Sequence, residues 1–154
     1  MKWIKKILFA LLTVFIVIQF IQPARNQSGQ ILSTDITKTY NVPDSVQSVL
    51  KTACYDCHSN NTNYPWYSNI QPTAWMLAHH IKEGKADLNF SEFGSYSHRR
   101  QINKLKGIEH SLNDGTMPFW SYKLIHKNAN LSKEDKQLVI DWIEKTKDSL
   151  SSKN

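Results

Sequence analysis

The stretch Cys54-Tyr55-Asp56-Cys57-His58 contains both cysteines of this 154-residue chain. Two cysteines are too few for a disulfide-rich miniprotein, for a four-cysteine zinc site or for a ferredoxin cluster. Their spacing of three residues places the two thiols about one helical turn apart, with an imidazole directly after the second thiol. The stretch therefore offers two thiols and one ring nitrogen to a single bound group.

The pattern C-x-x-C-H is typical of the attachment site of a c-type haem. Cys54 and Cys57 can each form a thioether with one haem vinyl group, and His58 then lies beneath the iron as an axial ligand. Three other interpretations compete with this one: a structural disulfide, a thioredoxin-like redox pair and half of a zinc site. The disulfide would close too small a loop to stabilise much, the redox pair needs a βαβ context, and no second ligand pair has zinc spacing. We therefore predict one covalent haem c.

A second iron ligand is expected from a methionine, because a thioether is a known sixth ligand in cytochromes c and raises their reduction potential. Met117 lies 59 residues after His58, in a loop that Pro118 stiffens. We predict that Met117 is the distal ligand; the alternative is that it fills a gap in the core. His80 is the histidine that best suits a pocket or ligand role. The remaining histidines are interpreted as surface or satisfied side chains, namely His79, His98, His110 and His126.

An aromatic run follows the cysteine motif closely and contains Tyr64, Trp66 and Tyr67. These rings are predicted to wall the porphyrin, where a phenol or indole could also donate to a propionate. Ordinary core packing is an equally simple interpretation and does not exclude the first. Scattered lysines after the motif could form a docking face for an acidic partner, although solvated lysines are the default explanation.

The first 21 residues predict a membrane anchor or signal sequence. Lys2, Lys5 and Lys6 precede an apolar run over residues 7–21, which would span about 22 Å as a helix. No small-residue cleavage site follows the run. We therefore predict an uncleaved N-terminal transmembrane helix, with a cleaved signal peptide as the alternative. The remainder of the chain would then lie on the periplasmic side of the bacterial inner membrane.

The formal net charge of +6 comes partly from this leader. Without its three lysines, 16 basic and 13 acidic residues remain, which is a net charge of +3. No basic stripe interleaved with aromatic residues is present, so nucleic-acid binding is not expected.

The rest of the chain divides into a polar tether over residues 22–42 and a helical domain over residues 43–150. Apolar spacing, capping residues and closing glycines predict helices, and no stretch alternates as a strand does. The predicted helices cover residues 44–53, 73–83, 98–113 and 133–149, with a short helical turn over 121–127. The sequence therefore predicts an all-α domain.

With these residues in view, the chain resembles the bacterial haem-binding domain family and, more distantly, the class I cytochromes c. The segments that carry the resemblance are Cys54–Asn60, Tyr64–Ser68, His80–Lys85, Leu88–Ser91, Met117–Pro118 and Tyr122–His126. The resemblance implies a cytochrome c-like helical fold around one covalent haem with His58 as the proximal ligand, and it implies no particular reaction. Class I cytochromes usually cross an aromatic of the last helix over a glycine of the first. Here Trp142 supplies the aromatic, and Ala53 or Ser48 must replace the glycine.

Three functions follow from these predictions. The first is a membrane-tethered electron carrier with iron between His58 and Met117, which exchanges electrons with a redox partner protein. The second is a haem-based sensor or peroxidase-like enzyme with an open or histidine-ligated iron, for which His80 or His126 could supply acid–base chemistry. The third is an assembly factor that uses Cys54 and Cys57 as a dithiol.

Overall fold

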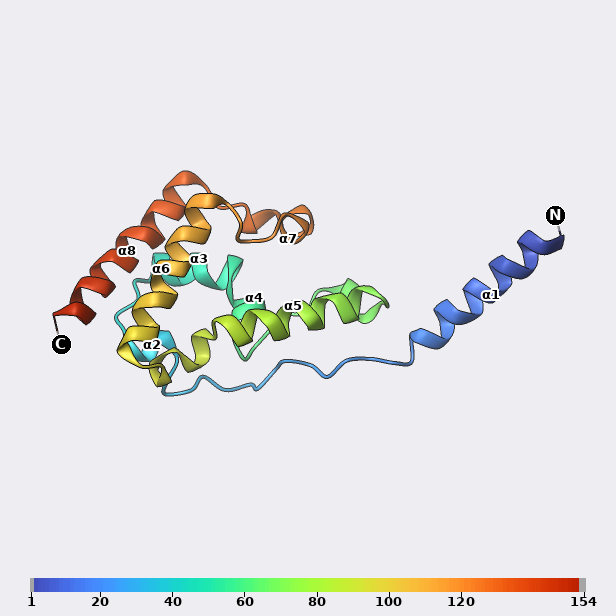
Figure 1. Ribbon diagram of the computed structural model, residues 1–154, viewed down its shortest axis with the longest axis horizontal. Coiled ribbons are helices and arrows are strands. Elements are labelled where there is room, and N and C mark those ends of the chain that lie inside the picture. Colours follow the sequence, from blue (N-terminus) through green and yellow to red (C-terminus); the bar gives the residue numbers. More distant parts are fainter. Residues whose placement is uncertain (1, 153–154) are drawn as a thin grey trace.

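The structure is a computed structural model that describes residues 2–152, and it is built from helices (Figure 1). The α-helices are α1 (Lys2–Ile18), α2 (Ile36–Thr39), α3 (Asp44–Ala53), α4 (Tyr55–His58), α5 (Thr73–Asp87), α6 (His98–Asp114), α7 (Trp120–Ile125) and α8 (Lys133–Ser151). The 3-10 helices are η1 (Trp66–Asn69), η2 (Phe90–Ser95) and η3 (Lys127–Ala129). Within residues 2–152 there is no strand, only an isolated bridge between Gln27 and Asn61. The prediction of an all-α fold is confirmed.

Local signals explain where the helices begin and end. Ser132 and Asp135 form the capping box that starts α8, with both reciprocal hydrogen bonds present. Gly115 ends α6 in the left-handed conformation, at a φ of 68°. The helix predicted over 73–83 continues to Asp87. Gly84 therefore lies inside the helix and does not end it, contrary to the sequence-based prediction.

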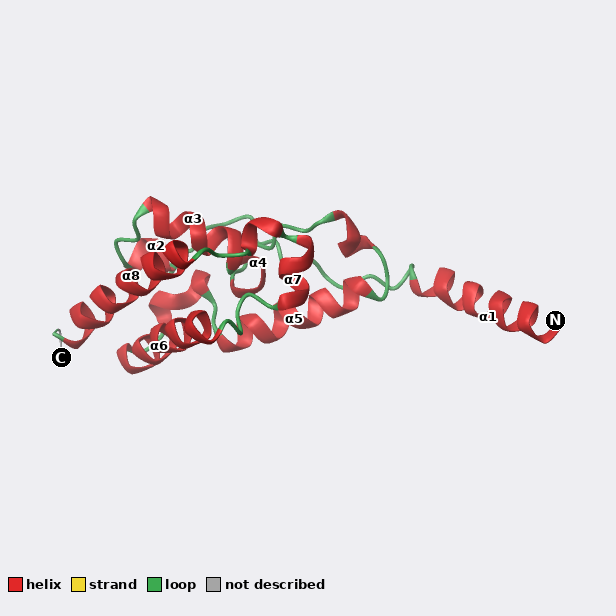
Figure 2. Cartoon of the chain, turned by 90° about the horizontal axis from the view of Figure 1, so that it is seen from above, coloured by secondary structure: helices red, strands yellow, loops and turns green. Residues whose placement is uncertain are grey.

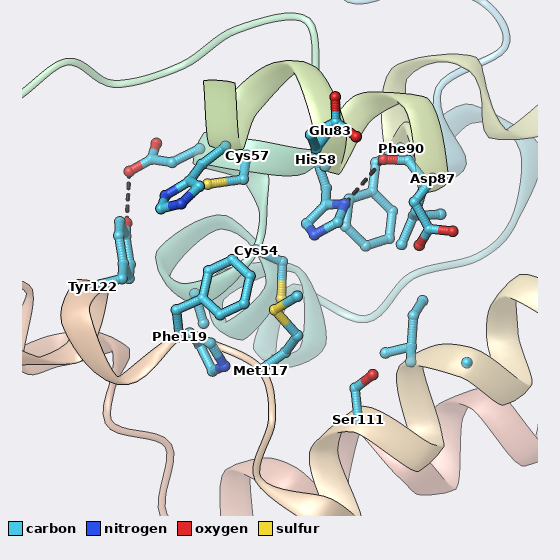
Figure 3. A pocket seen from close by; sticks show the side chains of 18 of the residues that line it. Cys54, Cys57, His58, Glu83, Asp87, Phe90, Ser111, Met117, Phe119 and Tyr122 are labelled. Atoms are coloured by element: carbon cyan, nitrogen blue, oxygen red, sulfur yellow. Dashed lines mark hydrogen bonds between the residues drawn. The ribbon is translucent and has the colours of Figure 1, made fainter. Parts of the chain in front are cut away.

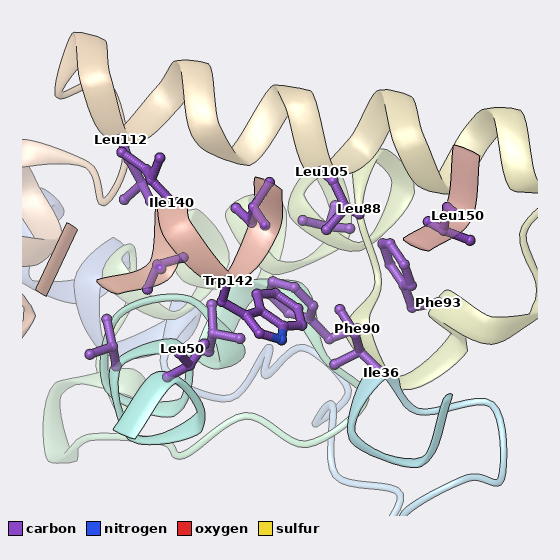
Figure 4. Close-up of a cluster of buried hydrophobic side chains, with 14 residues drawn as sticks. Ile36, Leu50, Leu88, Phe90, Phe93, Leu105, Leu112, Ile140, Trp142 and Leu150 are labelled. Atoms are coloured by element: carbon purple, nitrogen blue, oxygen red, sulfur yellow. The ribbon is translucent and has the colours of Figure 1, made fainter. Parts of the chain in front are cut away.

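The core lies between α3, α6, α8 and η2 (Figure 4). Trp142 of α8 is buried and its indole Nε1 donates to the backbone oxygen of Asn41, at 3.1 Å. Of the two small residues expected to replace the helix-crossing glycine, Ala53 is buried and Ser48 is exposed. Ala53 lines the cavity described below. The largest fully buried side chains include Phe90, Phe93, Leu50, Leu105 and Ile143.

The segment between α1 and α3 packs along the domain, which differs from the free tether expected for residues 22–42. The backbone N–H of Thr62 donates to the oxygen of Asn26, and the Asn26 side chain donates to the oxygen of Ser59. Further along, Asp35 and Ile36 are buried, and Ile36 joins the core. The polar residues of this segment make side-chain hydrogen bonds to the domain. A polar composition fits such a bonded segment and a solvated tether equally well, so composition alone did not predict this packing. We call residues 19–35 the strap.

Helix α1 extends away from the domain in both views (Figures 1 and 2), and none of its residues is buried. It contains 17 residues, about 26 Å of helix against a hydrocarbon core of about 30 Å. Among residues 2–152, no helix has the length and apolarity needed to cross a membrane. The predicted transmembrane helix is therefore wrong. The helix ends at Ile18, and the next residue, Gln19, contacts the domain: its Oε1 accepts from the backbone N–H of Gln71 at 2.9 Å.

Candidate haem-binding site

A cavity of about 550 Å³ lies between α4, α5, α6 and the loop that leads into α7 (Figure 3). A cofactor or drug-sized ligand typically occupies about 300–1,000 Å³. Apolar side chains form much of the wall, among them Leu88, Phe90, Ile108, Leu112 and Phe119. The lining side chains that could bind or react with a ligand are Cys54, Cys57, His58, His79, His80, Met117 and Tyr122. Charged side chains also line the cavity, namely Asp56, Glu83, Asp87 and Lys104.

The break between α3 and α4 brings both thiols to this cavity. Cys54 ends α3 and starts α4 with φ −125° and ψ −40°, so the chain turns at the first cysteine. Both cysteines are free. Burial, together with the charge of Cys57, raises the pKa of the Cys54 thiol to about 12. Burial, together with the charge of Asp56, raises the pKa of the Cys57 thiol to about 11. Such thiols stay protonated at neutral pH, whereas a catalytic dithiol needs a lowered pKa.

The imidazole of His58 is oriented by the backbone of the segment that follows α5. Its Nδ1 lies 3.0 Å from the backbone oxygen of Leu88. A carbonyl oxygen only accepts hydrogen bonds, so Nδ1 carries the hydrogen and Nε2 keeps its lone pair. The edge of the ring also packs against Phe90, with centroids 6.4 Å apart. A metal-binding histidine is commonly oriented in this way by a partner at its other nitrogen.

Met117 reaches the same cavity from the loop between α6 and α7. Figure 3 shows it entering from the opposite side to His58. His80 also lines the cavity from α5, and its ring packs against Phe119 with centroids 5.4 Å apart. His79, expected at the surface, lines the cavity as well. One cavity therefore brings together the two thiols, the imidazole and the thioether.

The aromatic run lies outside the cavity, contrary to the expectation that it walls the porphyrin. Trp66 is 75% exposed on η1. The hydroxyl of Tyr64 accepts a hydrogen bond from the backbone N–H of Asn26. Tyr67 bonds His126 instead, with 2.7 Å between its hydroxyl and Nε2. The rings follow the cysteine motif in sequence, but the loop after α4 carries them beyond the cavity wall.

A comparison with protein-family models matches residues 13–145 to the haem-binding domain model. The chain belongs to the haem-binding domain family. The match covers most of the chain and includes every residue of the cavity. Searches of the curated proteins and of the solved structures find no match.

The residues of this haem-binding domain suit a haem by their chemistry. Two thiols without partners stand about one helical turn apart at one edge of the cavity. The lone pair of His58 Nε2 is the kind of donor that binds haem iron, and a methionine thioether is another. The surrounding wall is largely apolar, as a porphyrin face requires.

The sequence does not reveal a polar network that borders the cavity. The hydroxyl of Tyr122 donates to Asp56 Oδ2 at 2.6 Å, although 66 residues separate them. Burial first, and then the hydrogen bond to Asp56, raises the pKa of Tyr122 above its usual range, so the phenol remains protonated and can donate. The ring of Tyr122 stacks on His126 with centroids 4.1 Å apart. The network ties α7 to Asp56, one of the two residues between the cysteines.

The close approach of α5 to the cysteine motif depends on a glycine. A Cβ on Gly84 would lie 2.7 Å from the backbone oxygen of Cys57, a distance that real Cβ atoms essentially never show. Gly84 therefore allows α5 to lie directly against α4. At the cavity edge nearby, Lys104 pairs with Asp87 at 2.6 Å.

Proposed function

We propose that this haem-binding domain is an exported c-type cytochrome that carries single electrons. Support comes from the set of side chains on one cavity: two thiols, the His58 imidazole and the Met117 thioether. An iron bound by both His58 and Met117 has no open position for a substrate, so it can only exchange electrons. This pairing of His58 and Met117 on one cavity is the single observation that carries the proposal.

Each group of residues has a separate task in this proposal. Cys54 and Cys57 hold haem c through thioethers, and the bound haem supplies one-electron chemistry. The oxygen of Leu88 keeps Nε2 of His58 aimed into the cavity. Apolar side chains exclude water and so lower the reorganisation that accompanies a change of iron charge. The Tyr122–Asp56 hydrogen bond holds the loop side of the cavity against the cysteine motif.

The proposal also includes export to the periplasm. Lysines followed by an apolar helix are the general form of an export signal. Once exported, the domain would exchange electrons with a redox partner protein.

A second function rests on the histidines of α5. His79 and His80 both line the cavity, so either could replace Met117 at the iron or act as an acid–base group beside an open iron site. In that case the domain would be a haem-based sensor or a peroxidase-like enzyme.

The experiment that separates these functions uses the protein made with a c-type maturation system. A haem stain on a denaturing gel is expected to show covalent haem. The oxidised protein is expected to show the weak long-wavelength absorption typical of methionine–iron ligation, and M117A is expected to lose it. M76A is the matched control, since Met76 is exposed and lies off the cavity.

Two outcomes would contradict electron transfer through His58 and Met117. One is a wild-type spectrum that M117A leaves unchanged. The other is rapid carbon monoxide binding to the reduced wild-type protein, which would show an open iron position and favour the sensor or enzyme. A gel without covalent haem would reject both functions.

A further inference from the structure

The end of the domain where α5 begins is built from segments that contain no carboxylate. The chain has 13 acidic residues, and none of them lies in residues 1–34 or 57–82. These segments supply η1, the first turns of α5 and strap residues 19–25. We call these three parts together the tip. Arg25 adds a positive charge here: its guanidinium lies 4.2 Å from the Tyr64 ring centroid and donates to Ser68. The tip is therefore either neutral or positive over its whole surface.

The tip also presents large apolar side chains to solvent. The exposed members of this group are Phe20, Ile21, Trp66, Ile70, Trp75 and Met76. Phe20 and Trp66 are 83% and 75% exposed, so these side chains are presented outward rather than left at the edge of the core. A cluster of exposed large apolar side chains at one end of a domain commonly marks a contact with another body.

Hydrogen bonds connect this surface directly to the point where α1 leaves the domain. The backbone oxygen of Ile21 accepts from Gln71 Nε2 at 2.8 Å and from the Trp75 indole Nε1 at 3.0 Å. Gln71 is completely buried by this contact. Both views show α1 leaving from the same end of the domain as the start of α5 (Figures 1 and 2). The apolar surface of the tip therefore continues into α1, whose apolar side chains are exposed all round.

The geometry points to a lipid surface as the partner of the tip: Trp66, Ile70 and Trp75 lie at the headgroup level of a bilayer that contains anionic lipid. Tryptophan is enriched at the interface between lipid and water, where its ring is apolar and its N–H polar. The absence of carboxylates avoids repulsion from anionic headgroups, and Arg25 attracts them. A second copy of the chain would cover only one face of α1, whereas a lipid surface can contact the exposed apolar side chains of α1 together with those of the tip.

This arrangement also sets the height of the haem cavity. Trp75 lies at the tip, and Glu83 of the same helix lines the cavity. Eight residues of α-helix span about 12 Å. With the tip at the lipid headgroups, this part of the cavity lies about two helical turns along α5 from them.

A lipid-crosslinking map tests the inference. Full-length protein is reconstituted with vesicles of phosphatidylcholine and phosphatidylglycerol that contain a phospholipid with a photoactivatable diazirine at its headgroup. Peptides covering residues 64–78 are expected to carry lipid adducts after irradiation, and peptides of α8 are expected to carry none. Adducts confined to α1, or equally abundant on α8, would overturn the inference. Protein–protein crosslinks between two copies of residues 66–76, without lipid adducts there, would assign the surface to a dimer.

A pair of variants matched for exposure extends the test. W66E/I70E places two negative charges on the tip, and the adduct yield at residues 64–78 is expected to fall by about tenfold. The control is I31E/L138E, because Ile31 and Leu138 are 71% and 36% exposed, against 75% and 40% for Trp66 and Ile70. The control is expected to keep the wild-type yield. An equal loss in both variants would reject the lipid contact. The wild-type map decides the question without any variant, and it does not depend on how iron is ligated.

Discussion

The two sides of the cavity are held in very different ways. The proximal side, with the cysteines and His58, is fixed from several directions: the oxygen of Leu88 orients the imidazole, and the strap bonds the loop that follows α4. On the distal side, the backbone N–H of Met117 makes one long hydrogen bond, 3.4 Å, to the oxygen of Ser111. The difference indicates that the side with the cysteines and His58 is preorganised, whereas the backbone of Met117 itself is held by fewer contacts.

The largest effect is expected from removing the imidazole on the proximal side. H58A is expected to abolish the low-spin haem spectrum, because no other nitrogen of α4 can take its place. Added imidazole is expected to restore part of the spectrum by filling the vacated space. H80A is the control on the same cavity and is expected to keep the wild-type spectrum. A low-spin spectrum in H58A without added imidazole would contradict the assignment of the proximal ligand.

The next effect concerns the contact between α5 and the cysteine motif. G84A is expected to lower the free energy of unfolding by about 2 kcal/mol, because its Cβ would overlap the backbone oxygen of Cys57. In G107A the new Cβ meets no protein atom within 4 Å. Because Gly107 lines the cavity, the variants are compared without haem, and G107A is then expected to be as stable as the wild type or more stable. Urea unfolding measures both. Equal losses of unfolding free energy in the two variants would show that α5 can shift away from Cys57 to accommodate the Cβ at position 84.

A smaller effect is expected where α7 is tied to the motif. Y122F removes the hydrogen bond to Asp56 and is expected to cost about 1.5 kcal/mol at pH 7. The pKa of Tyr122 is raised in the folded state, so its stabilising effect is complete below pH ~10, where the unfolded phenol titrates, and declines as the pH rises further. Unfolding measured at pH 7 and pH 11 should therefore show a smaller difference between wild type and variant at pH 11. A difference that grows with pH would contradict the raised pKa.

The smallest effect is expected in the distal loop. The hydroxyl of Thr116 lies 3.5 Å from the oxygen of Ser111 and is exposed. T116A is therefore expected to change the free energy of unfolding by less than about 0.5 kcal/mol. A loss above 1 kcal/mol by urea unfolding would show that the distal loop is held as firmly as the proximal side.

Local patterns predicted the helices well, because caps and apolar spacing act within a few residues. The capping box at Ser132 and the glycine after α6 both lie where the sequence places them. The strap was misinterpreted because its hydrogen bonds join residues far apart, such as Asn26 and Thr62. The end of α1 was placed too late, at residue 21 instead of Ile18, because an apolar run does not reveal that Gln19 bonds the distant Gln71.

The sequence by itself determined which reactive groups stand together in the cysteine motif, since the spacing of Cys54, Cys57 and His58 is a local property of one helical turn. Only the tertiary structure decided what surrounds that turn. It turned Nε2 of His58 into the cavity through Leu88, brought Met117 and two histidines of α5 to the same space, and moved the aromatic run away from it. These outcomes depend on contacts between segments dozens of residues apart. The periodicity or spacing of residues within one segment cannot predict such contacts.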